Sequence, residues 1–304
     1  MGSPRVAVGP GNASFAAEAV ESGGGSAVSL SEDPEALVWL DSHDVTGLRD
    51  ALAEAPSVRW VQVPSAGVES LTEVIDETRT WTCAKGAYAG PVAEHALALA
   101  LAGLRHLPSR FAARSWGRQA GTSLFGQRVT ILGGGGIARS LLELLAPFEV
   151  EATVVNRSGS PVPRAAHTVS VSALDAALPD AMVVVLALSL TAETQGIIGA
   201  QQLRLMDDTT WLVNVARGGH LDTDALVEAL REGSIAGAAL DVTDPEPLPE
   251  GHPLWDLANC IITPHTADTI EMVLPLLAER IRTNVARFAT GDKLVGLVDP
   301  ELGY

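Results

Sequence analysis

Cysteine is scarce in this 304-residue chain, which contains only Cys83 and Cys260. Neither belongs to a C-x-x-C pair, and a disulfide scaffold would need more cysteines than these two. We therefore expect reduced thiols buried in the core of a cytoplasmic protein. The histidines also lack the spacing of metal ligands, so we assign no metal site.

Positive charge is the second deficit, with 20 Lys and Arg against 37 Asp and Glu and a formal net charge of −17. An excess of carboxylates repels phosphate backbones and anionic lipids, so we expect neither nucleic acid nor a membrane as a partner. Long apolar runs are lacking too, because the most apolar helical stretch, 96–104, is far shorter than the ~20 residues of a membrane span. The first five residues lead straight into a short strand, and we expect no secretory signal.

Apolar residues make up 47% of the chain, enough for one large domain or two modest ones. In the first part, helical patterns such as 45–55 and 71–77 alternate with strand-like runs at 5–9, 26–30, 37–40, 58–63 and 80–84. Pro91 then opens a long helix, and a polar, Arg-rich connector follows at 108–125. This alternation predicts a parallel sheet flanked by helices.

The second part repeats this alternation and ends in a strong helix at 271–288. Its strand-like runs lie at 128–132, 151–156, 182–188, 210–215, 235–240 and 260–263. Helical patterns intervene at 136–146, 200–206 and 223–232. Strands that are almost continuously apolar are typical of a parallel sheet covered on both faces.

The stretch RVTILGGGGIARSLLELL, residues 128–145, predicts a strand, a tight glycine turn and a helix. Gly133-x-Gly135-x-x-Ala138 fits the dinucleotide-binding pattern G-x-G-x-x-[G/A]. Gly133 would allow the sharp turn, and Gly135 would let the backbone approach a pyrophosphate. The N–H groups at the start of the helix would face the phosphates. Taken alone, the motif also fits a flexible glycine loop without a ligand.

Asn156, Arg157 and Ser158 end the next strand, at the distance where dinucleotide-binding proteins place the residue that contacts the ribose. Asn156 occupies the position that usually carries Asp or Glu for NAD. A carboxylate there would repel a 2′-phosphate, whereas an Arg would pair with it. These residues favour NADP(H), with NAD(H) still possible and a surface arginine as the alternative.

Three further strands end in polar residues at the edge that carries the glycine turn. Arg217 follows LVNV, Glu246 lies in the loop after IAGAALDV, and His265 follows IIT. Ligands of open α/β sheets bind at the carboxyl ends of strands. Arg can hold a carboxylate by paired hydrogen bonds, and His can exchange a proton near neutral pH. Asp244 competes with Glu246 for the place beside His265.

Several motifs in one order resemble the D-isomer-specific 2-hydroxyacid dehydrogenases. They are VRWVQVPSAGVE (58–69), PVAEHALALALAGLRHLP (91–108), LVNVARGGHLDTDALVEAL (212–230), GAALDVTDPEPLPEGHPLW (237–255) and ITPHTADT (262–269). The resemblance implies an NAD(P)-dependent oxidoreductase of small 2-oxo or 2-hydroxy acids. It also implies an α/β fold of two doubly wound parallel-sheet domains with a cleft between them. A flavodoxin-like substrate domain would comprise 1–90 and 272–304, and a Rossmann domain 91–271.

The same resemblance assigns roles to individual positions. Arg217 would bind the substrate carboxylate, His265 would exchange the proton of the carbonyl oxygen, and Glu246 would orient His265 and keep it protonated. The N–H groups of Ala66 and Gly67 would take the other carboxylate oxygen. The dinucleotide would be lined by Gly133, Gly135, Gly136, Ile137, Leu188, Val215 and Asp241. A homodimer through the dinucleotide domain is also implied.

The chain departs from the family pattern at Ala138, Asn156, His220 and Asp268. Two alternative functions follow from the same fold. Formate- or phosphite-type oxidation is one, but formate enzymes of this family carry Gln where Glu246 stands. A dinucleotide-sensing regulator without turnover is the other, and the sequence shows no basic patch that such a role would need.

Overall fold

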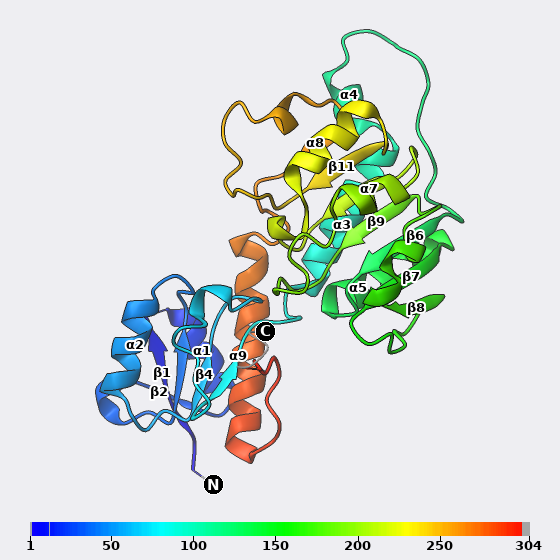
Figure 1. The fold of residues 1–304 in the computed structure, drawn as a ribbon. Coiled ribbons are helices and arrows are strands. Elements are labelled where there is room, and N and C mark those ends of the chain that lie inside the picture. The colour runs from blue at the N-terminus through cyan, green and yellow to red at the C-terminus, as the bar shows by residue number, and fades with distance from the viewer. Residues whose placement is uncertain (1, 12, 300–304) are drawn as a thin grey trace. The chain divides into compact units, whose positions relative to one another are not determined.

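The computed structural model describes residues 2–11 and 13–299, and the chain divides into two units (Figure 1). Unit 1 comprises Met1–Tyr88 together with Thr269–Tyr304, and unit 2 comprises Ala89–Asp268. Unit 1 is therefore discontinuous in sequence, because the C-terminal segment returns to the N-terminal one.

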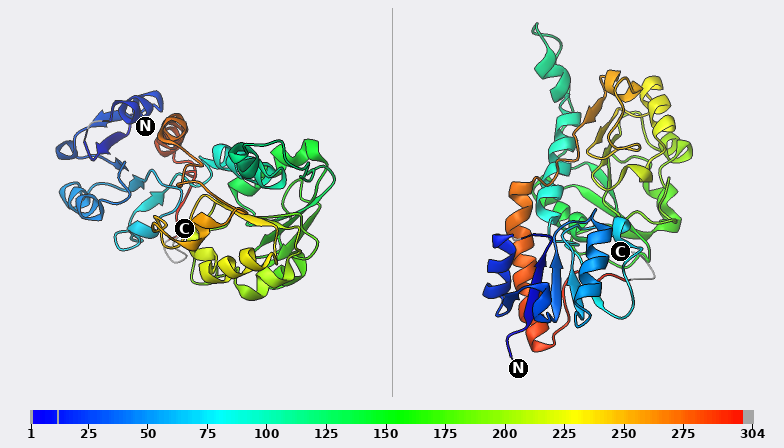
Figure 2. Two further views of the ribbon diagram at one scale, coloured as in Figure 1. Left: turned by 90° about the horizontal axis from the view of Figure 1, so that it is seen from above. Right: turned by 90° about the vertical axis from the view of Figure 1, so that its left-hand side faces the viewer.

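Unit 1 contains a five-stranded sheet in the order β2-β1-β3-β4-β5, with every neighbouring pair parallel. This is the flavodoxin-like order 2-1-3-4-5. The strands are β1 (Arg5–Gly9), β2 (Ser26–Val28), β3 (Ala36–Trp39), β4 (Trp60–Gln62) and β5 (Thr80–Thr82). The helices are α1 (Ser14–Ser22), α2 (Val45–Glu54) and α9 (Ile270–Thr290). Helix α1 packs against α9, the last helix of the chain (Figure 2).

Unit 2 contains a seven-stranded parallel sheet in the order β12-β11-β10-β9-β6-β7-β8. Its strands are β6 (Arg128–Leu132), β7 (Glu151–Asn156), β8 (His167–Ser170), β9 (Val183–Leu186), β10 (Trp211–Asn214), β11 (Gly237–Leu240) and β12 (Cys260–Ile262). The chain runs outward from β6 to β8 and then returns to place β9 on the other side of β6. That reversal is the switch point of a Rossmann sheet, where ligands bind. The predicted fold class is confirmed in both units.

Helices cover both faces of the second sheet. They are α3 (Ala89–Leu104), α5 (Gly136–Leu145), α6 (Leu174–Ala177), α7 (Ala200–Leu205) and α8 (Thr223–Glu232). The short helix α4 (Leu107–Ala112) follows α3 and has no buried residue. Helices α3 and α5 pack together on one face, and α7 and α8 pack together on the other (Figure 2). All four residues of β9, β10 and β11 are buried, as a doubly covered parallel sheet requires.

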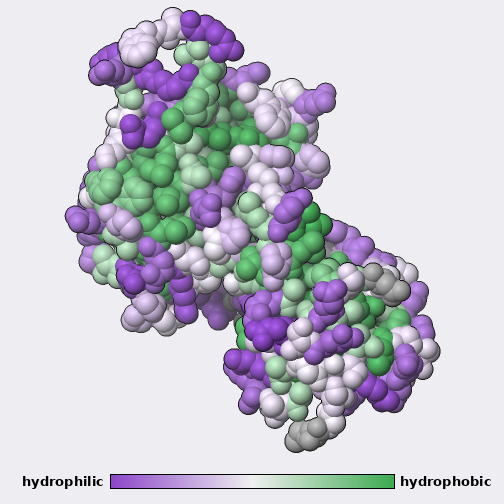
Figure 3. All heavy atoms as spheres, turned by 180° about the vertical axis from the view of Figure 1, so that it is seen from behind, coloured by the Kyte–Doolittle hydropathy of each residue, from purple (hydrophilic) through white to green (hydrophobic). Residues whose placement is uncertain are grey.

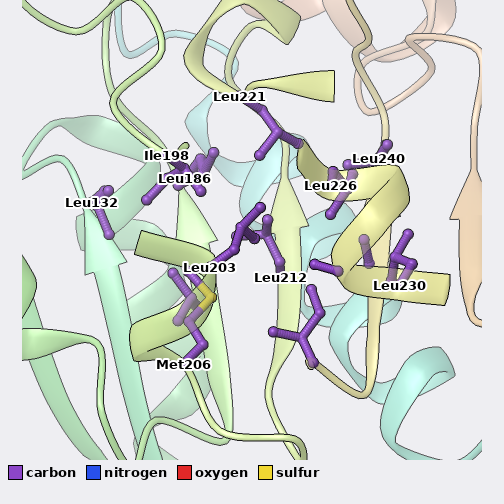
Figure 4. Close-up of a cluster of buried hydrophobic side chains, with 14 of the residues drawn as sticks. Leu132, Leu186, Ile198, Leu203, Met206, Leu212, Leu221, Leu226, Leu230 and Leu240 are labelled. Atoms are coloured by element: carbon purple, nitrogen blue, oxygen red, sulfur yellow. The ribbon is translucent and has the colours of Figure 1, made fainter. Parts of the chain in front are cut away.

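The core of unit 2 is a cluster of aliphatic side chains between the sheet and the layer of α7 and α8. Figure 4 shows Leu186 and Leu212 from the strands facing Leu203, Leu226 and Leu230 from the helices. Helix α8 is capped at its N-terminus, because the side chain of Asp222 accepts the N–H of Ala225. The packed layer thus fixes the strands whose ends carry the candidate site.

Three details differ from the sequence-based expectation. The helix expected at 71–77 is wrong: the chain makes a single turn at Glu69–Leu71, and Asp76 then accepts the N–H groups of Thr78 and Arg79, which turns the chain toward β5. Strand β8 was not predicted. The long helix begins at Ala89, which places Pro91 in its first turn.

Candidate active site

The turn between β6 and α5 requires glycine at its first position. Gly133 has a φ of 110°, and a Cβ on it would lie 2.1 Å from the carbonyl oxygen of Ala187, which follows β9. Gly135 is the opposite case: it precedes α5 with a φ of −79°, and a Cβ there would meet no atom within 4 Å. The first N–H groups of α5, beginning at Gly136 and Ile137, have no intrahelical acceptor. Open space beside this helix start fits a dinucleotide phosphate.

Asn156 ends β7, and its side chain is used by its own loop. The Oδ1 atom accepts the N–H groups of Ser158 at 3.2 Å and Gly159 at 2.6 Å, and Nδ2 donates to the carbonyl of Ser160 at 2.8 Å. The side chain of Arg157 is exposed, and the hydroxyl of Ser158 lies 2.7 Å from that of Ser160. Asn156 therefore shapes the loop, and Arg157 and Ser158 are its exposed side chains next to the end of β7.

Leu188 and Val215 follow the neighbouring strands β9 and β10. The N–H of Val215 donates to the carbonyl of Leu186 at 3.3 Å, which extends the strand pairing by one residue. The backbone of Leu188 passes so close to Gly133 that a Cβ on the glycine would lie 3.0 Å from its nitrogen. Leu188 therefore lies beside the glycine turn, and Val215 lies at the same edge of the sheet, at the end of the strand next to β9.

The loop that carries Arg217 is organised by two buried polar side chains. Asn214 accepts the N–H of Ala216 at 3.0 Å and donates through Nδ2 to the carbonyl of Arg217 at 2.9 Å. The Nδ1 atom of His220 lies 3.0 Å from the same carbonyl, which requires that this nitrogen carry a hydrogen. Both side chains are fully buried, whereas Arg217 is only partly buried. The backbone is thus fixed while the guanidinium remains accessible.

Gly218 lets the Arg217 loop approach the Glu246 loop. A Cβ on Gly218 would lie 2.0 Å from the carbonyl carbon and oxygen of Thr243. No other residue type fits such a backbone-to-backbone contact. The loops after β10 and β11 therefore meet directly.

Glu246 and His265 form a close pair. The Nδ1 atom of His265 lies 2.6 Å from Oε1 of Glu246, and the side chains are 44% and 41% exposed. A carboxylate can only accept a hydrogen bond, so Nδ1 carries the hydrogen and Nε2 is the ring nitrogen that remains for chemistry. The other oxygen, Oε2, accepts the N–H of Thr243 at 3.3 Å. The competing acid Asp244 contributes its backbone carbonyl to the hydroxyl of Thr223.

Three consecutive N–H groups converge on Asp241 at the end of β11. His265 donates to its carbonyl at 2.8 Å, Thr266 to Oδ1 at 2.9 Å and Ala267 to Oδ2 at 3.0 Å. His265 itself has a φ of 49°, an unfavourable conformation for a side chain with a Cβ. The bonds to Asp241 hold the turn in that conformation.

Two more donors reach the same carboxylate from other elements. Thr263 donates its hydroxyl to Oδ1 of Asp241 at 2.5 Å, and Nε2 of His95 on α3 lies 3.3 Å from that oxygen. Burial raises the pKa of Asp241, but the hydrogen bonds from His95, Thr263 and the backbone outweigh it and lower the pKa to about 2. His95 lies on α3, and no local sequence pattern marks it as a partner of Asp241.

Asp268 lies within electrostatic reach of the same residues. Burial raises the pKa of its carboxyl, the charges of His265 and Arg217 oppose the rise, and that of Asp241 adds to it. These interactions bring Arg217, Asp241, His265 and Asp268 into one electrostatic neighbourhood.

Ala66 and Gly67 lie in unit 1, in the bend that follows β4. Among the described residues of unit 1, neither N–H group donates to a protein acceptor. Such paired backbone donors suit an oxygen of a carboxylate.

In the part of the chain that the structure describes, residues 2–11 and 13–299, no three His, Cys, Asp or Glu side chains gather as metal ligands would. None of the helices in those same residues is long and apolar enough to cross a membrane.

Comparison with known proteins gives a consistent result. Residues 96–267 match the family model described as D-isomer specific 2-hydroxyacid dehydrogenase, NAD binding domain. An uncharacterised protein of Corynebacterium melassecola is 41% identical over 256 residues, which cover 82% of this chain and 84% of that protein. The glyoxylate reductase of Pyrococcus furiosus is 30% identical over 286 residues, which cover 89% of this chain and 84% of the relative.

A solved structure covers almost the whole chain. The D-isomer specific 2-hydroxyacid dehydrogenase of Xanthobacter autotrophicus Py2, in complex with NADPH and MES, superposes with a TM-score of 0.85 at 25% identity. It spans 99% of this chain and 100% of its own. The switch-point glycine turn and the loops that carry Arg217, Glu246 and His265 thus occur in a chain that belongs to the D-isomer specific 2-hydroxyacid dehydrogenases, as an NAD(P)-dependent enzyme.

Proposed function

We propose that this enzyme transfers a hydride between NADP(H) and a small 2-oxo acid or D-2-hydroxy acid, with glyoxylate and hydroxypyruvate as the first candidates. The observation that carries the proposal is the 2.6 Å contact between His265 Nδ1 and Glu246 Oε1, in loops that adjoin Arg217. A relative that is 30% identical is a glyoxylate reductase, which supports the substrate class.

Each residue has a distinct task in the proposed reaction. Arg217 pairs with the substrate carboxylate, and the N–H groups of Ala66 and Gly67 bind its other oxygen. His265 gives the proton on Nε2 to the carbonyl oxygen during reduction and takes it back during oxidation. Glu246 orients the ring through Nδ1 and compensates the positive charge that the ring carries before it gives up the proton. The bound nicotinamide supplies or accepts the hydride.

The dinucleotide site favours NADP(H). Gly133 permits the tight turn, and Gly135 leaves room for the pyrophosphate. The loop shaped by Asn156 offers Arg157 and the hydroxyl of Ser158 to the ribose. The guanidinium and hydroxyl donors suit a 2′-phosphate, and no carboxylate side chain stands at the end of β7 to repel it. The related structure with NADPH bound supports this preference.

A homodimer through unit 2 is part of the proposal. The connector after α3 exposes large apolar side chains, with Phe111 at 77%, Trp116 at 95% and Phe125 at 61% exposure. Leu144 on α5 is also exposed, and Figure 3 shows a broad apolar area on this face of unit 2. Apolar surface of this kind suits an interface between subunits. We place the dimer in the cytoplasm, where the two free thiols stay reduced.

The test follows NADPH and NADH oxidation separately with glyoxylate, hydroxypyruvate, pyruvate and phenylpyruvate. We expect turnover that prefers NADPH and collapses in Arg217→Ala and His265→Ala, while both variants still bind NADPH. Turnover that prefers NADH would contradict the cofactor preference alone. No turnover with any of the four acids would overturn the proposed substrate class.

A further inference from the structure

Five consecutive carbonyl groups, those of residues 63–67 after β4, all accept hydrogen bonds within unit 1. The donors are Gln62 Nε2 to Val63 at 2.8 Å, Tyr88 Oη to Pro64 at 2.5 Å, Ala84 N–H to Ser65 at 2.8 Å, Cys83 Sγ to Ala66 at 3.4 Å and Ser65 Oγ to Gly67 at 2.5 Å. Three of these donors come from residues 83–88, the segment that follows β5. The bend is therefore fixed from its carbonyl side.

A fixed carbonyl also fixes the N–H group of the next residue. In a trans peptide the C=O and N–H bonds point in opposite directions. The bond from Ala84 to the carbonyl of Ser65 thus sets the N–H of Ala66, and the bond from Cys83 to the carbonyl of Ala66 sets the N–H of Gly67. Both N–H groups face away from the protein atoms that hold the bend.

Cys83 is itself immobilised at every polar atom. Its N–H donates to the carbonyl of Gly296 at 2.8 Å, and its carbonyl accepts Nη1 of the buried Arg280 at 2.7 Å. Burial raises the pKa of the Cys83 thiol, so the sulfur keeps the hydrogen that it donates. The second guanidinium nitrogen of Arg280 donates to the carbonyl of Lys85 at 3.0 Å.

A second buried network supports the strand ends beneath the bend. Asn284 on α9 donates to Oε1 of Gln62 at 2.9 Å, and the hydroxyl of Thr82 donates to the same oxygen at 2.9 Å. Gln62, Thr82 and Asn284 are fully buried. Helix α9 thus reaches the bend by two routes, through Asn284 to Gln62 and through Arg280 to Cys83.

We infer that Cys83 and Tyr88 are positioning residues for the substrate carboxylate. Cys83 orients the peptide plane that aims the Gly67 N–H, and Tyr88 fixes the carbonyl of Pro64 in the same bend. The inference rests on the proposed role of Ala66 and Gly67 in carboxylate binding. Loss of either side-chain donor lets the bend rotate, which weakens substrate binding while the proton and hydride chemistry is retained.

The test compares Cys83→Ala, Cys83→Ser and Tyr88→Phe in the full-length enzyme. Loss of one hydrogen bond in Cys83→Ala or Tyr88→Phe raises KM for the 2-oxo acid about three- to tenfold, with kcat and KM for NADPH within about twofold of wild type. Cys83→Ser keeps a hydrogen-bond donor, so we expect its kcat and KM values to stay close to those of wild type. Cys260→Ala, at the other cysteine, is the matched control and leaves all constants unchanged.

Binding of oxalate, an unreactive analogue of the 2-oxo acid, provides a readout without turnover. In calorimetric titrations with NADP⁺ present, we expect oxalate affinity to weaken by the same three- to tenfold in Cys83→Ala and Tyr88→Phe. In Cys83→Ser we expect the wild-type affinity. An active wild type whose KM and oxalate affinity do not change in Cys83→Ala and Tyr88→Phe would overturn the inference and leave the proposed function intact. A lower melting temperature as the only effect would show a purely structural role and overturn it equally.

Discussion

Glu246 uses both carboxylate oxygens to hold His265 in place. Oε1 accepts the hydrogen on Nδ1 of His265 at 2.6 Å, and Oε2 accepts the N–H of Thr243 in its own loop. The Thr243 contact keeps the carboxylate from rotating away, although both side chains are partly exposed. The pair therefore combines a fixed ring orientation with a negative charge next to the ring.

Replacement of that charge tests its contribution. Glu246→Gln keeps an oxygen that can accept from Nδ1 but loses the negative charge that stabilises the protonated ring. We expect kcat for 2-oxo acid reduction to fall about 10- to 100-fold, with KM for NADPH unchanged. Steady-state kinetics measure both constants. Asp244→Asn removes the neighbouring acid of the same loop, and we expect its kcat to stay within about twofold of the wild-type value.

Two glycines of the turn between β6 and α5, Gly133 and Gly135, have different roles. Gly135→Ala adds a methyl group to open space, so the fold is unaffected but a phosphate can no longer approach, and NADPH binding weakens about tenfold or more. Gly133→Ala meets the Ala187 carbonyl at a φ of 110°, and the melting temperature falls by several degrees. Fluorescence titration and thermal melts measure the two effects. Gly90→Ala, also in open space, changes neither property.

Arg157 is the residue expected to distinguish NADPH from NADH. In Arg157→Ala we expect KM for NADPH to rise about 10- to 100-fold and KM for NADH to change little, because only NADPH carries the 2′-phosphate. Arg164→Ala is the matched control, since that arginine pairs with Glu143 on α5. Equal losses for both cofactors in Arg157→Ala would contradict the proposed contact. Asn156→Ala, by contrast, disrupts the loop and affects both cofactors.

Asp241 makes unit 2 sensitive to acid. Its pKa is lowered from 3.8 to about 2, so its bonds to the His265 turn contribute fully above pH ~4 and are lost as the pH falls toward ~2. The shift corresponds to about 2 kcal/mol of unfolding free energy. Denaturant unfolding at a series of pH values measures it. Asp241→Asn flattens the slope in this range, and an unchanged slope would contradict the assignment.

Much of the fold could be predicted because its strands are covered on both faces. β9 and β10 are wholly buried, which produces apolar runs that are visible in the sequence. β8 escaped prediction because it is a short edge strand with an exposed histidine and a half-buried Thr-Val-Ser. The helix expected at 71–77 failed because the Asp76 side chain competes for backbone N–H groups, which an apolar pattern does not show.

The candidate site divides in the same way. Arg217, Glu246 and His265 could be singled out in the sequence because each follows a strand and so lies at the carboxyl edge of the sheet. The end of an apolar strand is visible in the local sequence. His95 could not be predicted, because its partner Thr263 lies 168 positions away and the contact depends on how α3 packs. The sequence showed that Asn156 ends a strand next to the glycine turn. It did not show that the Asn156 side chain forms hydrogen bonds within its own loop.

The discontinuity of unit 1 has a consequence for the order of synthesis. Unit 2 ends at residue 268, so it can pack its sheet before the last helix leaves the ribosome. Unit 1 must wait, because Asn284 and Arg280 reach Gln62 and Cys83 only after α9 has been made. The N-terminal strands, translated first, are thus the last to acquire their complete set of partners. In a nascent chain arrested before α9, we expect unit 2 to resist proteolysis and the first 88 residues to be cleaved.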